Sequence, residues 1–442
     1  LTSSLGPSRT AAVSERDFDN DGILNIFDGH HPRINVREEA LSSSTIHTCA
    51  LLDNGSVSCW GKGSYGQLGN GDTNDRTTPT LTSSLGVGRT AVFISSGGYH
   101  TCAILDNGSV SCWGSGENYG QLGNGGTSSS NTPTLTSSLG TGRTAVALSS
   151  GTQHTCAILD NGSVSCWGIN NFGQLGNGGT SDKYSPTLTS SLGAGRTAVA
   201  ISSGEFHTCA ILDNGLVSCW GYGFYGQLGN GGSGSTADKT TPTLTSSLGS
   251  GRTAVALSSG DRYTCAILDN GSVSCWGLGQ EGQLGNGGTS GKNSPTLTSS
   301  LGRTAVAISS GESHTCAILD NGSVSCWGEG ANGRLGNGAT LQQTAPTFTS
   351  SLGTGRTAVE ISSGFKHTCA ILDNGSVSCW GSGSDGRLGY GGNNDNTTPT
   401  LTNSLGTNRT ALLIDGDMDG DGTSELFDDF PNNPIRSISC NP

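Results

Sequence analysis

The sequence predicts an all-β fold, a β-propeller of seven four-stranded blades flanked by short calcium-binding loops. Three observations lead to this prediction. The segment CAILDNGSVSCWG occurs seven times with small changes, and successive first cysteines lie 53, 54, 53, 56, 51 and 53 residues apart. Each copy holds four apolar or β-branched runs separated by glycine turns, which is typical of a propeller blade. The composition, with 73 glycines and 12% charged residues, favours tight turns and short strands over long helices.

We divide the chain into four parts. Residues 1–13 repeat the closing part of a blade, residues 14–35 form a calcium-binding linker, residues 36–414 form the propeller, and residues 415–442 form a second calcium-binding segment. The chain thus holds eight copies of the LTxSLG…RTA piece but seven cysteine hairpins. An unpaired strand exposes its backbone groups, so the extra copy needs a partner. Either native chains are longer tandem arrays of propellers, or identical subunits donate this strand head-to-tail into a neighbour, which we favour.

The two flanking segments carry oxygen ligands at the spacing of a calcium loop. Positions 1, 3, 5, 7, 9 and 12 are occupied by Asp17, Asp19, Asp21, Ile23, Asn25 and Asp28, and by Asp417, Asp419, Asp421, Thr423, Glu425 and Asp428. Position 7 offers its carbonyl, and a glycine at position 6 permits the bend. Both loops resemble those of dockerin and thrombospondin type-3 repeats. An acidic linker without bound metal is the alternative, and we expect Ca²⁺ to stiffen both segments.

The cysteines pair two by two within each copy. A three-residue Asp-Asn-Gly loop places Cys102 directly opposite Cys112, whereas a two-residue turn would place Cys102 opposite Trp113. We therefore predict seven disulfides: Cys49–Cys59, Cys102–Cys112, Cys156–Cys166, Cys209–Cys219, Cys265–Cys275, Cys316–Cys326 and Cys369–Cys379. Each is worth about 3 kcal/mol in the chain-entropy model. Seven such bonds indicate an oxidising, extracellular or cell-surface location. Cys440 has no partner left, and we expect it to bond to another chain or segment.

Two further repeated residues have structural explanations. One histidine precedes the Thr-Cys pair in six copies, but Tyr263 replaces it in the fifth, so we expect a buried side chain hydrogen-bonded to backbone rather than a ligand or catalyst. N-glycosylation triplets begin at Asn54, Asn107, Asn161, Asn270, Asn321, Asn374, Asn396 and Asn408. The hairpin turn alone explains the asparagine in the Asn-Gly-Ser copies, and modification at exposed loop tips is the alternative.

The combined repeat GxxHTCAILDNGSVSCWGxGxxGQLGNG resembles that of the regulator of chromosome condensation family, over residues 36–414. The resemblance implies a seven-bladed propeller. It does not carry a function, because members of the family exchange nucleotide on a small GTPase or serve as plain binding surfaces, and the fold supports both.

The net charge and the repeat pattern argue against several classes of function. A net charge of −13 argues against a nucleic-acid partner, and no apolar run reaches the length of a membrane span. The near-identical copies leave no unique set of acid, base and nucleophile, so we expect no enzyme activity. Copies differ mainly in the residues before His or Tyr and in the loop after Gly-Asn-Gly. We predict an extracellular structural or assembly module of a cell surface or filament; the alternative is a secreted protein that binds a protein or glycan through one propeller face.

Overall fold

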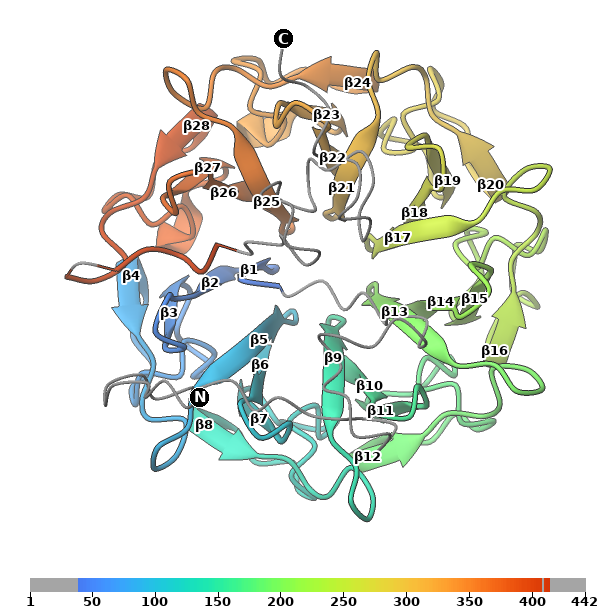
Figure 1. Cartoon of the computed structure of the whole chain (residues 1–442), viewed down its shortest axis with the longest axis horizontal. Helices are drawn as coiled ribbons and strands as arrows, with labels where there is room; N and C mark the ends of the chain where they lie inside the picture. Colours follow the sequence, from blue (N-terminus) through green and yellow to red (C-terminus); the bar gives the residue numbers. More distant parts are fainter. Residues whose placement is uncertain (1–38, 408, 414–442) are drawn as a thin grey trace, which may run out of the picture. The chain divides into compact units, whose positions relative to one another are not determined.

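The structure, a computed structural model, describes residues 39–407 and 409–413, which form seven antiparallel sheets of four strands each. Within every sheet the strands are adjacent in chain order. Figure 1 shows the sheets arranged radially around a central axis. The predicted all-β propeller of seven four-stranded blades is therefore confirmed.

The strands fall into four sets according to their distance from the axis (Figure 1). The innermost are β1 (Leu41–Ser43), β5 (Ala91–Ser96), β9 (Ala145–Ser150), β13 (Ala198–Ser203), β17 (Ala254–Ser259), β21 (Ala305–Ser310) and β25 (Ala358–Ser363). The second are β2 (His47–Leu51), β6 (His100–Leu105), β10 (His154–Leu159), β14 (His207–Leu212), β18 (Tyr263–Leu268), β22 (His314–Leu319) and β26 (His367–Leu372). The third are β3 (Val57–Gly61), β7 (Val110–Gly114), β11 (Val164–Gly168), β15 (Val217–Gly221), β19 (Val273–Gly277), β23 (Val324–Gly328) and β27 (Val377–Gly381). The outermost are β4 (Arg76–Leu81), β8 (Ser130–Leu135), β12 (Lys183–Leu188), β16 (Lys239–Leu244), β20 (Lys292–Leu297), β24 (Gln343–Phe348) and β28 (Asn396–Leu401). The helical elements of the described residues are two short 3-10 turns, η1 (Ala331–Gly333) and η2 (Ser384–Gly386).

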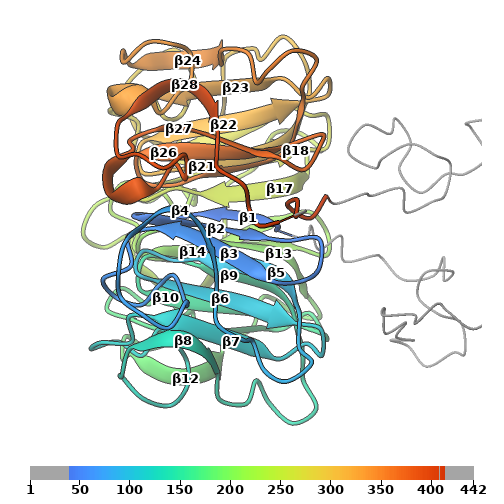
Figure 2. The ribbon, with the colours of Figure 1, turned by 90° about the vertical axis from the view of Figure 1, so that its left-hand side faces the viewer.

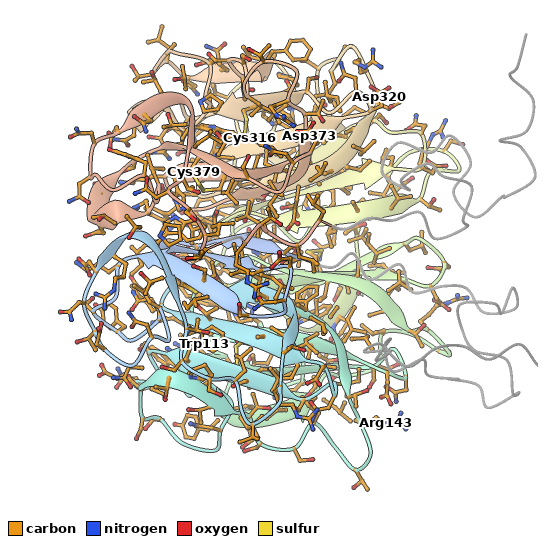
Figure 3. The ribbon with its side chains drawn as sticks, turned by 60° about the vertical axis from the view of Figure 1, so that its left-hand side comes forward. Trp113, Arg143, Cys316, Asp320, Asp373 and Cys379 are labelled. Atoms are coloured by element: carbon orange, nitrogen blue, oxygen red, sulfur yellow. A yellow bond between two sulfur atoms is a disulfide. The ribbon has the colours of Figure 1, made fainter. Side chains whose placement is uncertain are left out.

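The second and third strands of each blade form the hairpin that the cysteine spacing predicts. In blade 2, Cys102 lies opposite Cys112 and Ile104 lies opposite Val110. The three-residue loop ends at Gly108, whose φ of 74° is rarely adopted by a residue with a side chain. All seven blades have this register, and disulfides join all seven cysteine pairs. These sulfurs are buried, and Figure 3 shows the labelled cysteines inside the disc.

The tryptophan of each Trp-Gly pair joins its blade to the preceding one. The indole Nε1 of Trp113 donates to the carbonyl oxygen of Gln67 at 3.0 Å, and the other six tryptophans make the equivalent bond. Gly69 lies against the same indole, where a Cβ would come within 2.6 Å of Nε1. The repeated Gly-Gln-Leu-Gly sequence therefore wraps over the tryptophan of the next blade.

Two more sets of hydrogen bonds run from blade to blade. His100 Nε2 lies 2.7 Å from the Thr155 hydroxyl of the next blade, and all six buried histidines make this contact. The partner is thus a threonine hydroxyl of the neighbouring blade, not the backbone as we expected. Nearer the axis, the Ser96 N–H donates to Ser42 Oγ at 2.8 Å, and seven such bonds circle the axis. Each blade therefore makes the same kinds of hydrogen bond to the blade that follows it around the ring.

The ring closes with residues from both ends of the described chain. β1 is short because the first residue of this innermost strand is supplied by Ala411, which pairs with Leu52. The Asp53 N–H also donates to the Thr410 carbonyl oxygen at 3.2 Å. Equivalent pairs begin the innermost strand in the other blades. The LTxSLG…RTA copy near residue 409 therefore completes blade 1 within the same chain.

A buried carboxylate reinforces this closure. Glu360 of β25 accepts hydrogen bonds at Oε1 from the N–H groups of Ala40 (3.0 Å) and Leu41 (2.8 Å). Its side chain is 6% exposed, and the equivalent position in the other blades is alanine or, once, Phe93. The contact between blades 7 and 1 is therefore chemically distinct from the other six.

The outermost strand of every blade contains a proline. These residues are Pro79, Pro133, Pro186, Pro242, Pro295, Pro346 and Pro399. Proline has no N–H group to donate to a further strand, so it is tolerated at a sheet edge and discourages strand addition there. The rim of the propeller is therefore a poor place for strand-to-strand assembly.

Candidate interaction face

The connections between strands gather on two opposite sides of the disc, seen edge-on in Figure 2. The hairpin face carries the Asp-Asn-Gly loops and the connections between blades, which in blade 2 are residues 106–108 and 136–144. The variable face carries the turns before His or Tyr and the loops after Trp-Gly, which in blade 2 are residues 97–99 and 115–129. The two faces differ in how much their residues change from blade to blade.

The hairpin face repeats one ion pair seven times. The pairs are Arg89–Asp106, Arg143–Asp160, Arg196–Asp213, Arg252–Asp269, Arg303–Asp320, Arg356–Asp373 and Arg409–Asp53. Figure 3 shows Arg143 and Asp320 toward the same side of the disc. Exposed ion pairs of this kind contribute about 0–1 kcal/mol each. Their uniformity indicates a structural role rather than selective recognition.

The predicted glycosylation asparagines lie mostly on the hairpin face. The six Asn-Gly-Ser asparagines are exposed, and each Oδ1 accepts hydrogen bonds from the serine two residues later, as in Asn107 and Ser109. Asn396 begins the outermost strand β28 and is partly buried, while Asn408 lies outside the described residues. Modification of these side chains stays a prediction.

At the centre of the variable face lies a small cavity, which we call the channel mouth. It has a volume of about 80 Å³ and is lined by the Ser-Gly ends of the innermost strands. Its lining also includes Thr45, Gly98, Thr152, Asp261, Glu312 and Phe365 from the turns that follow these strands. The hydroxyls of Ser43 and Ser96 are buried there without a hydrogen-bond partner among the described residues. Pockets for cofactors typically reach several hundred cubic ångströms, so this one suits a few waters or the end of one side chain.

Three successive blades place an acidic residue at or beside the channel mouth: Glu205, Asp261 and Glu312. The Asp261 carboxylate makes no hydrogen bond or ion pair with the residues that the structure describes. Burial and the nearby Glu205 and Glu312 carboxylates together raise the pKa of Asp261 to about 7, against the lowering effect of Arg262. Glu312 lies 3.5 Å from a guanidinium nitrogen of Arg334. Asp261 is thus a partly buried carboxyl group that no arginine or lysine of the described residues pairs directly.

An aromatic cluster lies beside these acids on blades 3 and 4. It consists of Phe172, Phe206, Tyr222, Phe224 and Tyr225. The ring centroids of Phe172 and Tyr222 are 4.6 Å apart, and those of Phe172 and Phe206 are 5.3 Å apart. The Phe224 side chain is 44% exposed. Contiguous, partly exposed aromatic rings of this kind are characteristic anchors of protein interfaces.

Arg262 connects the aromatic cluster to the acidic residues. Its Nε donates to Glu205 Oε2 at 3.2 Å, and its Nη1 donates to the Tyr225 hydroxyl at 3.3 Å. The guanidinium carbon also lies 5.3 Å from the centre of the Tyr225 ring. Arg262 is therefore already neutralised by Glu205 and holds the ring of Tyr225 in place.

A second cleft of about 300 Å³ lies across blades 6, 7 and 1. Its lining includes Ile46, Phe365, Lys366 and Arg387. The Arg387 guanidinium is buried and already donates to the Thr45 carbonyl and to other groups of the protein. The cleft combines apolar side chains with the charge of the partly buried Lys366.

The predicted calcium ligands at 17–28 and 417–428 lie outside the described residues, as does Cys440. Within the described part of the chain, no group of three or more His, Cys, Asp or Glu side chains is arranged to hold a metal ion. None of its helices is long and apolar enough to cross a membrane. The turns before His or Tyr, singled out from the sequence, do line the channel mouth.

Phe172 and Tyr222 of the aromatic cluster were not predicted from the sequence. Tyr222 follows Trp-Gly directly, and the residue at this position differs in every blade except two that carry serine. That variation was a usable signal. Phe172 lies in the corresponding loop of the preceding blade, so only the packing of blades shows that the two rings touch.

Fold and variable face together define a propeller with one chemically diverse surface. The model of the RCC1-like domain matches residues 26–305, and the regulator of chromosome condensation (RCC1) repeat matches residues 305–334, 358–387 and 321–371. The chain therefore belongs to the RCC1-like propeller family.

Among the relatives, the ultraviolet-B receptor UVR8 of Arabidopsis thaliana is 33% identical over 83% of this chain and 81% of its own. The human E3 ubiquitin-protein ligase HERC2 is also 33% identical, over 73% of this chain but 7% of the much longer ligase. Yeast RCC1 (Prp20), solved bound to Kap60, is similar in structure with a TM-score of 0.70 at 19% identity, over 91% of this chain and 90% of that one. Human WBSCR16 is similar with a TM-score of 0.69 at 19% identity, over 79% of this chain and 94% of that one. The last two likenesses concern the fold alone.

Proposed function

We propose that this protein is an extracellular interaction module that binds a partner protein through the variable face. The observation that carries the proposal is the aromatic cluster, which lies on one face while the opposite face repeats the same ion pair in every blade. A protein partner gains most of its binding energy from a few such aromatic and arginine side chains.

The relatives support a protein partner. Yeast RCC1 has been solved bound to Kap60, and a second structure of Prp20p is described together with its binding to Gsp1p and histones. Those partners belong to those proteins. What the likeness offers this chain is a precedent for the propeller as a docking surface.

The extracellular location rests on the disulfides, because buried sulfur pairs in every blade persist best in an oxidising compartment. We further propose that Ca²⁺ binds the flanking segments 17–28 and 417–428. A role in head-to-tail assembly by strand donation is less favoured, because the described ring already completes its blade 1 with residue 411.

The test is a selection of phage-displayed random peptides on the immobilised protein. We expect the selected peptides to lose roughly tenfold or more in affinity when Phe206 and Phe224 are both changed to Ala. Phe348→Ala is the matched control, since this side chain is 55% exposed at the end of β24, remote from the variable face. Thermal unfolding checks that each variant is folded. Peptides that bind both variants as well as the parent protein would contradict the proposal.

A further inference from the structure

We propose that the partner protein inserts the cationic end of one Lys or Arg side chain into the channel mouth while an apolar part of it covers the aromatic cluster. This inference rests on the proposed function and specifies the chemistry of the partner. It follows from the size of the channel mouth, the groups that line it and its position beside the cluster.

The size of the channel mouth fits one side chain. A volume of about 80 Å³ is far below that of a typical ligand pocket but exceeds the space that one water requires. Serine residues line the cavity, and the buried hydroxyls of Ser43 and Ser96 have no hydrogen-bond partner among the described residues. An ammonium or guanidinium group supplies several N–H donors, which such hydroxyls accept.

The charge of the lining selects a cation. Asp261 and Glu312 line the cavity, and Glu205 lies close enough to Asp261 to repel it. Arg262 and Arg334 are engaged with Glu205 and Glu312 respectively, whereas the Asp261 carboxylate has no cation bonded to it among the described residues. A partly buried carboxylate that lacks a bonded cation gains from a cation that the partner brings. The net charge of −13 also attracts cationic partners at a distance.

The aromatic cluster extends the same surface. Arg262 lies next to Asp261 in sequence and contacts Tyr225 of the cluster. A partner loop with a basic residue next to apolar residues can therefore place its positive charge at Asp261 and its apolar side chains on the aromatic cluster. The cleft beside Lys366 is the competing site for an acidic partner. It is the weaker candidate because the donors of Arg387 already serve Thr45, Ser384 and Asp385.

The peptides from the selection on the parent protein provide the test. We expect them to be enriched in Lys or Arg, and we expect Asp261→Asn to weaken a synthetic copy of a selected peptide by roughly tenfold or more. Replacing the arginine of that peptide by citrulline, which keeps the shape and removes the charge, should have a similar effect. Asp106→Asn is the matched control, because it removes one carboxylate from the hairpin face.

Three outcomes separate the inference from the proposed function. Peptides that need the aromatic cluster but carry no basic residue, or that bind the Asp261→Asn variant equally well, overturn the inference and leave the proposed function standing. Selection of no peptide that needs the cluster overturns both. Binding of a glycan array in place of peptides, lost in the Phe206→Ala and Phe224→Ala double variant, overturns the protein class of the partner.

Discussion

The buried histidines connect single residues to the stability of the ring. Because Thr155 donates its hydroxyl to the Gln121 carbonyl, His100 must donate its Nε2 proton to Thr155, which selects the Nε2–H tautomer of the neutral ring. Burial lowers the pKa of His47, His100, His154 and His207 to about 3, and that of His314 and His367 well below its usual value. Tyr263 shows that the position requires a buried ring with a polar tip and not an imidazole, since its hydroxyl donates to the His314 carbonyl.

These lowered pKa values predict loss of stability in weak acid. The unfolded chain takes up protons below its ordinary histidine pKa of 6.5, while the folded chain does so only near 3. The stability that the buried neutral histidines contribute is therefore fully present above pH 6.5, and the free energy of unfolding decreases as the pH falls toward 3. Between pH 7 and pH 5 each buried histidine should lower the free energy of unfolding by about 2 kcal/mol. Urea unfolding at the two pH values measures this, and His207→Tyr, which copies blade 5, should reduce the difference by one histidine's share. Equal stability at both pH values would contradict the neutral, buried state.

At the scale of elements, local sequence accounts for most of the fold. The spacing of Cys102 and Cys112 predicts the register and the three-residue loop, because every group involved lies within one hairpin. The short strand β1 was not predictable, since its first position is filled by Ala411, which is remote in sequence. The same limit applies to the aromatic cluster and to the threonine partners of the histidines. Each depends on how neighbouring blades pack against one another, and the sequence of one copy does not contain that information.

Glu360 should be the most sensitive residue at the closure between blades 7 and 1. Glu360→Ala removes the acceptor for two buried N–H groups, and we expect it to lower the free energy of unfolding by about 2–3 kcal/mol. Glu360→Gln keeps one acceptor oxygen and should lose less. Urea unfolding gives the free energies, and hydrogen exchange at Leu41 locates the change. If both variants matched the parent protein, the carboxylate would not be holding the closure.

At the scale of the whole molecule, the ring is held shut by a few residues near the end of the described chain. Truncation after residue 407 removes Ala411, which pairs with Leu52, and the Thr410 carbonyl, which accepts from the Asp53 N–H; we expect faster hydrogen exchange at Asp53 and a lower unfolding temperature. Truncation after residue 413 keeps both bonds and is the matched control. If the two truncated proteins behaved alike, closure would not depend on these residues. Formation of oligomers by the shorter protein alone would show that the opened position accepts a strand from another copy.

The one-directional contacts between blades have a consequence for the size of the ring. Each blade offers the same carbonyl, threonine and serine to its neighbour, so six of the seven contacts are nearly interchangeable. No such contact depends on the total number of blades in the ring. Duplication of one internal repeat would preserve every contact and change only the angle between blades. The number of repeats in the chain, rather than the chemistry of any interface, therefore sets the diameter of the central opening. The diameter in turn determines which side chain the opening admits.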